Sequence, residues 1–600
     1  MTPPNVFTLL EQAASRFGDA PALHQPTGAA SGPSYLTYSW TQFCHASREI
    51  AVGLRKLGIE RGDIVAVDAE TRAEFYLADF GIMGAGAIAA ALYTSYPPAE
   101  HVKTLRSCDA KLVFVDTPKT FSALMNAGAG DLAVRWILLT GEVSGVMGLG
   151  ELRRLGQQEL AADPTAFDRM HAQVKPEDYA ILYLTSGATG EPKMGLVRHG
   201  ALVENIEMGP KVIDLGPEDV ILAFLPSAHI AQRIGVELLS VRCGVPTWFS
   251  EGLARLPHEM QNVRPTFFLA PPRVWERIYS SVCTEIRKRG PAMRRVFWGA
   301  LGLGLKAAQL RREGKPVPAW MARMLTLADK VVFQKLRSRF GGRMRLAVSG
   351  AAPLGKDLAQ FYEAIGMPLI EGYGLTEGGI TTLNPVHAPK PGSIGKMLPG
   401  VLYKFTEDGE LCLGGPTIFA GYYKDPDTTA QVLRDGWLHT GDLAEVDAEG
   451  YFYITGRKKE MIVSSNGKKV YPSRLENLLK MEPIFNQIVL IGDKRPYVSA
   501  LFTINVAAAE SLKGMEGHKG RPMSELVTAE PVQAEVKRAV QKANKQLAAF
   551  EQIRKFRILE RELSIEHGEL TATMKVRRGK VMENFQSIIS ELYVGKEEMN

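Results

Sequence analysis

The chain has 600 residues, of which 45% are hydrophobic and 23% charged, and its formal net charge is +6 at pH 7. This length predicts two or more domains, and the composition excludes intrinsically disordered and collagen-like chains. The five cysteines form no Cys-x-x-Cys pair, which argues against a disulfide framework or a zinc site and favours a reducing, cytoplasmic environment.

The N-terminal part of the chain, from about Tyr38 to Val115, predicts α/β units. The N-terminus has acidic residues and no early basic cluster, so we expect no secretory signal. Helical patterns at residues 40–58 and 74–87 alternate with short apolar strands at 63–69 and 111–116, which is typical of a largely parallel sheet. Residues 80–99 carry no charge, but glycines and prolines shorten the apolar length below the ~20 residues of a spanning helix. We expect a buried helix and strand there.

A hydroxyl-rich and glycine-rich loop follows the apolar strand pattern of residues 179–184. Glycines let the backbone approach an anion, hydroxyls donate hydrogen bonds and a lysine adds positive charge. The spacing G-x-x-G-x-x-K lacks the Gly-Lys-Ser/Thr step of a Walker loop, so a Walker-type site is excluded. We therefore predict a strand followed by a different kind of phosphate loop, which contains Thr185, Ser186, Gly187, Thr189, Gly190 and Lys193.

Several later strand patterns also end in small or polar residues. Strands are predicted near residues 220–225, 266–270, 345–349 and 368–375, with a helix at 199–208 before them and helices at 272–278 and 356–366 between them. In open α/β sheets, ligands bind beyond the carboxyl ends of the strands. We expect the binding site there.

Residues 287–345 hold sixteen Lys or Arg against two acids, a local balance of +14, so the remainder of the chain sums to −8. Apolar and aromatic residues between these charges predict basic amphipathic helices. Two interpretations remain open, a solvated helical face and contact with an anionic membrane surface. No nucleic-acid-binding motif accompanies the charge, so no nucleic-acid partner is expected.

From Gly409 onward the patterns are those of β-hairpins, and a new small α+β pattern begins after Gly456. We place the domain boundary there. Residues 514–522 are expected to form an exposed loop and residues 577–593 a terminal helix.

Eight motifs occur in the order shown by the acyl-adenylate-forming superfamily, and the chain resembles its long-chain fatty acyl-CoA synthetases nearly from end to end. The motifs are LTSGATGEPK, FLPSAHIAQRI, LAPPRVWERIYS, LAVSGAAPL, EGYGLTEG, GWLHTGDL, ITGRKKEMIVSSNGKKVYP and GELTATMKVRR.

The resemblance implies an α/β fold with a large N-terminal domain, residues 1–456, and a small mobile α+β C-terminal domain, residues 457–600. The large domain would have parallel-rich sheets and a β-rich subdomain. The implied reaction uses ATP, Mg²⁺ and coenzyme A to convert a long-chain fatty acid to acyl-AMP and then to acyl-CoA. The protein would be a monomer or homodimer in the cytoplasm, with peripheral contact on the inner face of a membrane left open.

The resemblance also assigns roles to particular residues. Catalytic roles fall to Lys193, Thr376, Glu377 and Lys575, of which Glu377 would also bind magnesium. The nucleotide would be bound by the phosphate loop, including Thr185, Ser186, Gly187, Thr189, Gly190 and Lys193, and by Ala351, Gly372, Tyr373, Gly374, Thr376, Asp442 and Arg457. The acyl pocket or coenzyme A channel would include His229, Gly350 and Gly467, and Lys459 would be the hinge.

The chain departs from the family pattern at Ala188, Met194, Gly378 and Gln232. Ala188 removes one phosphate-contacting hydroxyl, and a neutral hydrogen bond is worth about 0.5 to 1.5 kcal/mol. Such a loss changes affinity without abolishing catalysis. Alternative functions are a ligase that stops at acyl-AMP, a ligase for medium-chain or aromatic acids, and a catalytically weakened membrane-associated protein that binds acyl-AMP or lipid.

Overall fold

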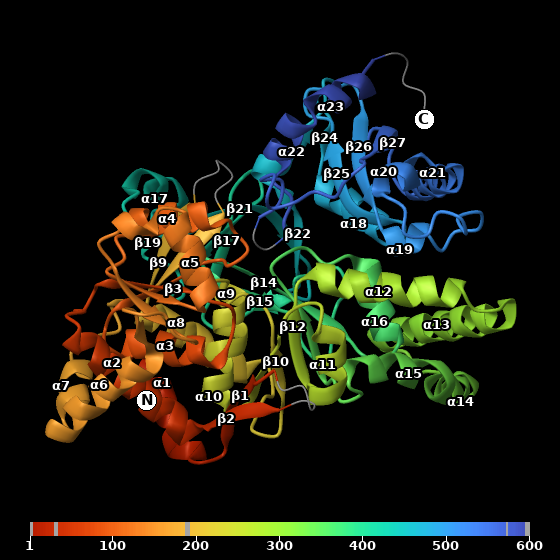
Figure 1. The fold of residues 1–600 in the computed structure, drawn as a ribbon. Helices are drawn as coiled ribbons and strands as arrows, with labels where there is room; N and C mark the ends of the chain where they lie inside the picture. Colours follow the sequence, from red (N-terminus) through yellow and green to blue (C-terminus); the bar gives the residue numbers. More distant parts are fainter. Residues whose placement is uncertain (1–3, 29–33, 187–191, 572–573, 595–600) are drawn as a thin grey trace.

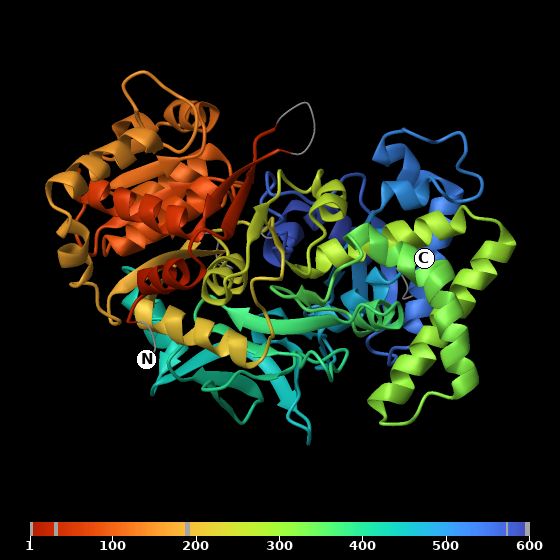
Figure 2. The same ribbon diagram turned by 90° about the horizontal axis from the view of Figure 1, so that it is seen from below.

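The structure is a computed structural model that describes residues 4–28, 34–186, 192–571 and 574–594 (Figure 1). A large N-terminal α/β domain is followed by a smaller C-terminal domain, drawn in blue in Figures 1 and 2. The predicted fold class is confirmed.

The first sheet of the large domain has eight strands in the order β19-β9-β8-β4-β3-β5-β6-β7. The strands from β8 to β7 along this order are parallel, whereas β9 and β19 add an antiparallel edge. Its central strands are fully buried, as expected for apolar runs between helices. Their bounds are β3 (Ile64–Asp68), β4 (Ile88–Ala91), β5 (Leu112–Val115), β6 (Arg135–Leu138), β7 (Met147–Gly148), β8 (Tyr179–Ser186), β9 (Pro192–Arg198) and β19 (Gly421–Tyr422).

The uncharged stretch at residues 80–99 is part of this layer. It contributes the end of α3 (Ala73–Gly84) and the strand β4, and both are buried. α3 packs beside α2 (Trp40–Lys56). Among the described residues, no helix is both long enough and apolar enough to cross a membrane.

The second sheet has nine strands in the order β16-β15-β14-β13-β12-β10-β11-β1-β2. The strands from β14 to β1 in this order are parallel, so the carboxyl ends of β12, β13 and β14 lie at one edge. That edge faces the C-terminal domain. The bounds are β1 (Pro21–Pro26), β2 (Tyr35–Ser39), β10 (Ile221–Ala223), β11 (Thr247–Phe249), β12 (Phe267–Ala270), β13 (Leu346–Ser349), β14 (Leu369–Leu375), β15 (Gly379–Leu383) and β16 (Lys396–Met397).

A third, antiparallel sheet forms the predicted β-rich subdomain. Its strands are β17 (Leu402–Phe405), β18 (Glu410–Gly414), β20 (Leu433–Arg434), β21 (Trp437–Val446) and β22 (Phe452–Arg457).

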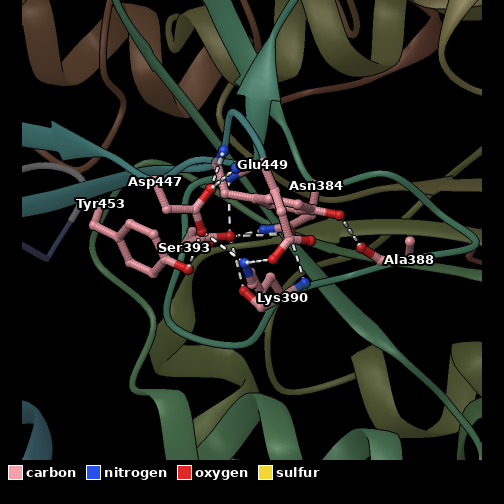
Figure 3. A network of polar contacts seen from close by, with 9 residues as sticks. Asn384, Ala388, Lys390, Ser393, Asp447, Glu449 and Tyr453 are labelled. Carbon is pink, nitrogen blue, oxygen red and sulfur yellow. Dashed lines mark hydrogen bonds and ion pairs between the residues drawn. The ribbon is translucent and has the colours of Figure 1, made fainter. Parts of the chain in front are cut away.

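The turn of the β21–β22 hairpin is held by the polar network of Figure 3. The Lys390 ammonium bridges Asp447 at 2.6 Å and Glu449 at 2.7 Å. Asn384 accepts a hydrogen bond from the Lys390 backbone and donates one to the Ser393 carbonyl. Loop 384–393 thereby fixes the hairpin whose far end carries the candidate site.

The C-terminal domain has its own sheet and hydrophobic cores. β25 (Phe485–Ile491), β26 (Val498–Ile504) and β27 (Ile553–Ile558) are covered by α18 (Pro472–Lys480) and α21 (Glu530–Asn544). The terminal helix predicted at residues 577–593 is two helices, α22 (Arg578–Asn584) and α23 (Gln586–Leu592). The prediction missed the break because Phe585 leaves helical geometry to place its ring in the core beneath Arg561.

Helix α12 (Pro272–Arg287) of the large domain forms a polar interface with the C-terminal domain. An interface of ion pairs and hydrogen bonds separates more readily than a large hydrophobic one. The contacts are Arg273 with Asn486, Glu276 with Lys480 and Arg287 with Glu535, at 2.6, 3.3 and 3.2 Å.

Candidate functional site

A cleft of about 1440 Å³ lies between the two domains. The large domain lines it with the carboxyl ends of β13 and β14 and with the β21–β22 hairpin, among other segments. The small domain lines it with residues 473–474, 476–478, 480, 487–488, 546–547, 574–576 and 578. Ligand binding beyond parallel strand ends is the arrangement expected for such a sheet.

The end of β13 brings small residues to the cleft. Ala351 lines it and has a φ of 69°, a left-handed conformation that is uncommon for a residue with a Cβ atom. Gly350 lies just behind, near the Gly372 carbonyl. Gly374 is required by the fold, because a Cβ atom there would lie 2.5 Å from the Gly379 carbonyl oxygen across the β14–β15 hairpin.

Three predicted nucleotide-binding side chains meet at one wall of the cleft. The carboxylate of Asp442 is buried and accepts hydrogen bonds from the Tyr373 hydroxyl at 2.7 Å and from Arg457 Nε at 2.7 Å. The register pairs Asp442 directly with Arg457 across the β21–β22 hairpin, and Tyr373 approaches from β14. The ion pair with Asp442 raises the pKa of Arg457, which therefore stays charged.

Lys575 reaches the same cleft from the C-terminal domain. Its side chain keeps exposed surface toward the cleft, yet protein from both domains surrounds it. This enclosure is the larger cause and repulsion from Arg457 the smaller cause of a lowered pKa, which is about 8 for Lys575. The negative charges of Asp442 and Glu377 oppose the change. Lys575 and Glu377, which are 575 − 377 = 198 positions apart in the sequence, are therefore electrostatic neighbours.

A second group of predicted residues meets where β9, β19 and the β14–β15 turn adjoin. The Tyr422 hydroxyl donates a hydrogen bond to Glu377 Oε1 at 2.5 Å, and the Lys193 ammonium lies 5.1 Å from the centre of the Tyr422 ring. Thr376 packs against Gly195, which neighbours Tyr422 in the sheet. A cation, a hydroxyl and a carboxylate thus lie together beside the end of β8.

Three residues that were predicted to lie in the phosphate loop are strand residues instead. Thr185 and Ser186 belong to β8, where they pair with Lys193 and Pro192 of β9, so the prediction that these residues and Lys193 lie in the loop is wrong. The antiparallel partner extends the strand past the apolar run, which strand propensity alone does not reveal. Gly187, Thr189 and Gly190 lie outside the described residues.

Three predicted residues lie apart from the cleft wall. His229 Nδ1 accepts a hydrogen bond from the Ala231 amide and so caps the helix that begins at Ile230; burial and the Lys575 charge lower its pKa to about 3. Gly467 lies in the exposed turn between β23 (Ile462–Val463) and β24 (Lys469–Val470). Lys459 is exposed in the short 3-10 turn after β22.

Sequence reasoning missed two residues of the site. Tyr422 holds Glu377, but a tyrosine in a two-residue strand gives no sequence signal. Glu371 lines the cleft with its carboxylate accepting from the Leu354 amide at 2.9 Å, and burial raises its pKa to about 8. Its place inside EGYGLTEG was the available signal.

Comparison with known protein families decides the family. The family described as AMP-binding enzyme matches residues 10–423, and the family described as AMP-binding enzyme C-terminal domain matches residues 459–597. This chain belongs to the AMP-binding enzymes. The resemblance inferred from the eight motifs is thereby confirmed.

Relatives of this AMP-binding enzyme cover nearly its whole length. Long-chain-fatty-acid–CoA ligase FadD15 of Mycobacterium tuberculosis is 34% identical over 580 residues, covering 94% of this chain and 95% of that protein. Long-chain-fatty-acid–CoA ligase ACSBG2 of Rattus norvegicus is 28% identical and covers 99% and 93%. The crystal structure of the anthranilate CoA ligase AuaEII with anthranoyl-AMP has the same fold, with a TM-score of 0.74 at 20% identity, covering 98% and 99%.

The lowered pKa of Lys575 predicts a pH dependence for any step that needs its charge. Lys575 loses its proton as the pH rises through about 8, so kcat/KM for ATP in acyl-AMP formation should fall about tenfold per pH unit above that value. We would measure it by pyrophosphate exchange without coenzyme A. In Lys575→Arg the guanidinium stays charged, and the decline should disappear.

Glu371 supplies the control, because its carboxyl group titrates in the same range and faces the same cleft. Glu371→Gln should keep the alkaline decline. Loss of the decline in Glu371→Gln, with its persistence in Lys575→Arg, would assign the titration to Glu371 instead.

Proposed function

We propose that this AMP-binding enzyme is an ATP-dependent ligase that converts a long-chain fatty acid to acyl-AMP and then to acyl-CoA, releasing pyrophosphate and AMP. The observation that carries the proposal is the meeting of Tyr373, Asp442 and Arg457 with Lys575 of the other domain in one cleft. The long-chain substrate follows the names of FadD15 and ACSBG2.

The cleft wall at β14 and β21 is the proposed nucleoside site. The Tyr373 ring would lie against the adenine, next to Ala351, Gly372 and Gly374. The Asp442 carboxylate would accept from both ribose hydroxyls, and its present partners Tyr373 and Arg457 already hold it in position. A pre-positioned acceptor loses little freedom when the ligand binds.

The group around Tyr422 is the proposed triphosphate site. Lys193 and the neighbouring Ser186, Thr189 and Gly190 would bind the β- and γ-phosphates, and Thr376 the α-phosphate. The oxygen donors fit magnesium, which is commonly held by one or two carboxylates together with substrate phosphates, and Glu377 is the carboxylate here. When bound, the ion would neutralise phosphate charge.

The two steps would use two arrangements of the C-terminal domain, which we propose begins after Gly456. In this structure Lys575 lines the cleft and Gly467 does not, which suits adenylation: the substrate carboxylate attacks the α-phosphorus and pyrophosphate leaves. Rotation about Lys459 would exchange Lys575 for the Gly467 turn. The coenzyme A thiolate would then attack the acyl carbonyl and displace AMP. The polar α12 interface supports such a movement.

Incubation with ATP, magnesium, palmitate and coenzyme A tests the proposal. We expect palmitoyl-CoA, AMP and pyrophosphate in equal amounts, with acids from C4 to C20 compared under the same conditions. Accumulation of acyl-AMP without thioester would indicate the acyl-AMP ligase. A preference for aromatic or medium-chain acids would revise the substrate, and no acid-dependent pyrophosphate release would indicate a binding protein.

We also propose a cytoplasmic location with peripheral contact at an anionic membrane. All five cysteines are free and buried, which fits a reducing environment. The choice between monomer and homodimer stays a prediction.

A further inference from the structure

Helix α14 (Ala319–Ala328) presents a continuous apolar stripe to solvent. Trp320, Met324 and Leu327 are 62%, 50% and 56% exposed, and Val331 in the following turn is 42% exposed. Their spacing of four, three and four residues places them on one face. We call these four residues the α14 stripe. The face beside the stripe packs inward through Met321.

Helix α13 (Pro291–Arg312) also exposes large apolar side chains. It exposes Met293, Val296, Trp298 and Leu305, so eight of the eighteen large hydrophobic side chains exposed in the described part of the chain lie between residues 293 and 331. A concentration of this kind marks a contact surface, because single exposed apolar residues are normally scattered. Figures 1 and 2 both place α13 and α14 at the outer edge of the molecule.

The basic segment of residues 287–345, which includes α13 and α14, carries cations that the described carboxylates of the protein do not neutralise. Of its sixteen Lys and Arg residues, six form ion pairs, including Arg312 with Glu363 and Arg337 with Asp329. Both acids of the segment are occupied within it. The other ten make no ion pair with the described carboxylates: Lys288, Arg289, Arg294, Arg295, Lys306, Arg311, Arg323, Lys330, Lys335 and Arg343.

We propose that the α13–α14 surface docks on an anionic lipid membrane, with the α14 stripe inserted at the interface. Tryptophan and long apolar side chains enter the headgroup boundary, and surrounding Lys and Arg side chains attract anionic lipids. A solvated helical face would not need four consecutive stripe positions to be large and apolar. An acidic protein is the alternative partner for this surface, and vesicle flotation distinguishes it from a membrane.

Docking through this surface would bring the reaction cleft to the bilayer. Gln309, Arg311 and Arg312 at the end of α13 line the cleft, so the helix that contacts lipid is also part of its wall. This inference rests on the proposed function, since a long-chain acid partitions into membranes and would reach the cleft from there. It predicts that acyl-CoA formation by variants of this surface depends on whether the acid is presented in a membrane or dispersed in detergent.

Vesicle flotation tests the surface directly. The full-length protein should bind phosphatidylcholine vesicles that contain phosphatidylserine, bind pure phosphatidylcholine much less, and lose binding as salt rises. Trp320→Ser/Met324→Ser/Leu327→Ser and, separately, Arg323→Glu/Lys330→Glu should each weaken binding at least about tenfold.

The matched controls lie elsewhere on the surface. Leu402→Ser/Tyr403→Ser removes exposed apolar side chains from the β-rich subdomain, and Lys119→Glu/Arg135→Glu reverses two exposed charges of the large domain. Both should bind vesicles as the unaltered protein does. Equal weakening in controls and stripe variants, salt-independent binding, or absent binding would overturn the proposal, and absent binding would leave an acidic protein as the occupant.

Activity separates this inference from the proposed function. With palmitate presented in the anionic vesicles, the stripe variants should lose acyl-CoA formation in proportion to binding, while with detergent-dispersed palmitate they should match the unaltered protein. If the stripe variants keep full activity in both assays, the docking proposal is overturned and the proposed function is unaffected. Absence of activity in the unaltered protein with dispersed palmitate would instead contradict the proposed function.

Discussion

Replacing Lys575 with alanine is expected to slow acyl-AMP formation about 10²- to 10³-fold, the usual effect of removing one pre-positioned charge from a site where negative charge develops. Lys575 lies among Arg457, Asp442 and Glu377 at the cleft, and its charge would stabilise the α-phosphate during attack. Thioester formation from supplied acyl-AMP should change little, because Lys575 would lie outside the cleft in the second arrangement that we propose for that step. Separate assays of the two half-reactions measure both effects.

Lys580→Ala is the matched control. Lys580 lies five residues away, pairs with Glu583 at 2.9 Å and does not line the cleft, so its loss should leave both half-reactions unchanged. An equal loss in the two half-reactions of Lys575→Ala would contradict the two arrangements of the C-terminal domain.

Replacing Asp442 with asparagine is expected to raise the KM for ATP about 10- to 100-fold. A hydrogen bond to a charged group contributes about 1.5–3 kcal/mol, and the carboxylate is the proposed acceptor for the ribose. The substitution keeps the side-chain shape but removes the charge that holds Arg457 and accepts from Tyr373. Isothermal titration with a nonhydrolysable ATP analogue measures the change without catalysis.

Asp447→Asn removes a carboxylate from the same β21–β22 hairpin and serves as the control. Asp447 accepts hydrogen bonds from the Lys390 ammonium and the Tyr453 hydroxyl in the network of Figure 3. Asp447 itself does not line the cleft. Because exposed ion pairs are worth about 0–1 kcal/mol, ATP affinity should change less than about fivefold. Matching losses in the two variants would mean that Asp442 acts by supporting the hairpin.

Much of the fold could be predicted from hydrophobic periodicity. The strands β3, β5, β12 and β13 and the helices α2 and α16 (Lys356–Ala364) lie where apolar runs and helical spacing place them, since burial in an α/β layer imposes those patterns. The meeting of Asp442 with Arg457 also follows from a hairpin pattern, because antiparallel register pairs residues on either side of a turn.

The remaining features depend on contacts between distant segments. The extension of β8 through Ser186 arises from pairing with β9, and the break at Phe585 arises from packing against Arg561. Tyr422 meets Glu377, 45 residues away, only because β19 adds to the edge of the first sheet. Neither propensity nor spacing specifies such meetings. The basic segment was visible as charge, whereas the α14 stripe required knowledge of which helix face is exposed.

A crystal structure with a nonhydrolysable palmitoyl-adenylate analogue tests most directly the claim that both domains close over one nucleotide. We predict that the adenine will lie beside Tyr373, the ribose hydroxyls on Asp442, and the Lys575 ammonium within hydrogen-bonding distance of the group that replaces the α-phosphate. An analogue bound outside the cleft, or bound there with neither Asp442 nor Lys575 in contact, would contradict the account.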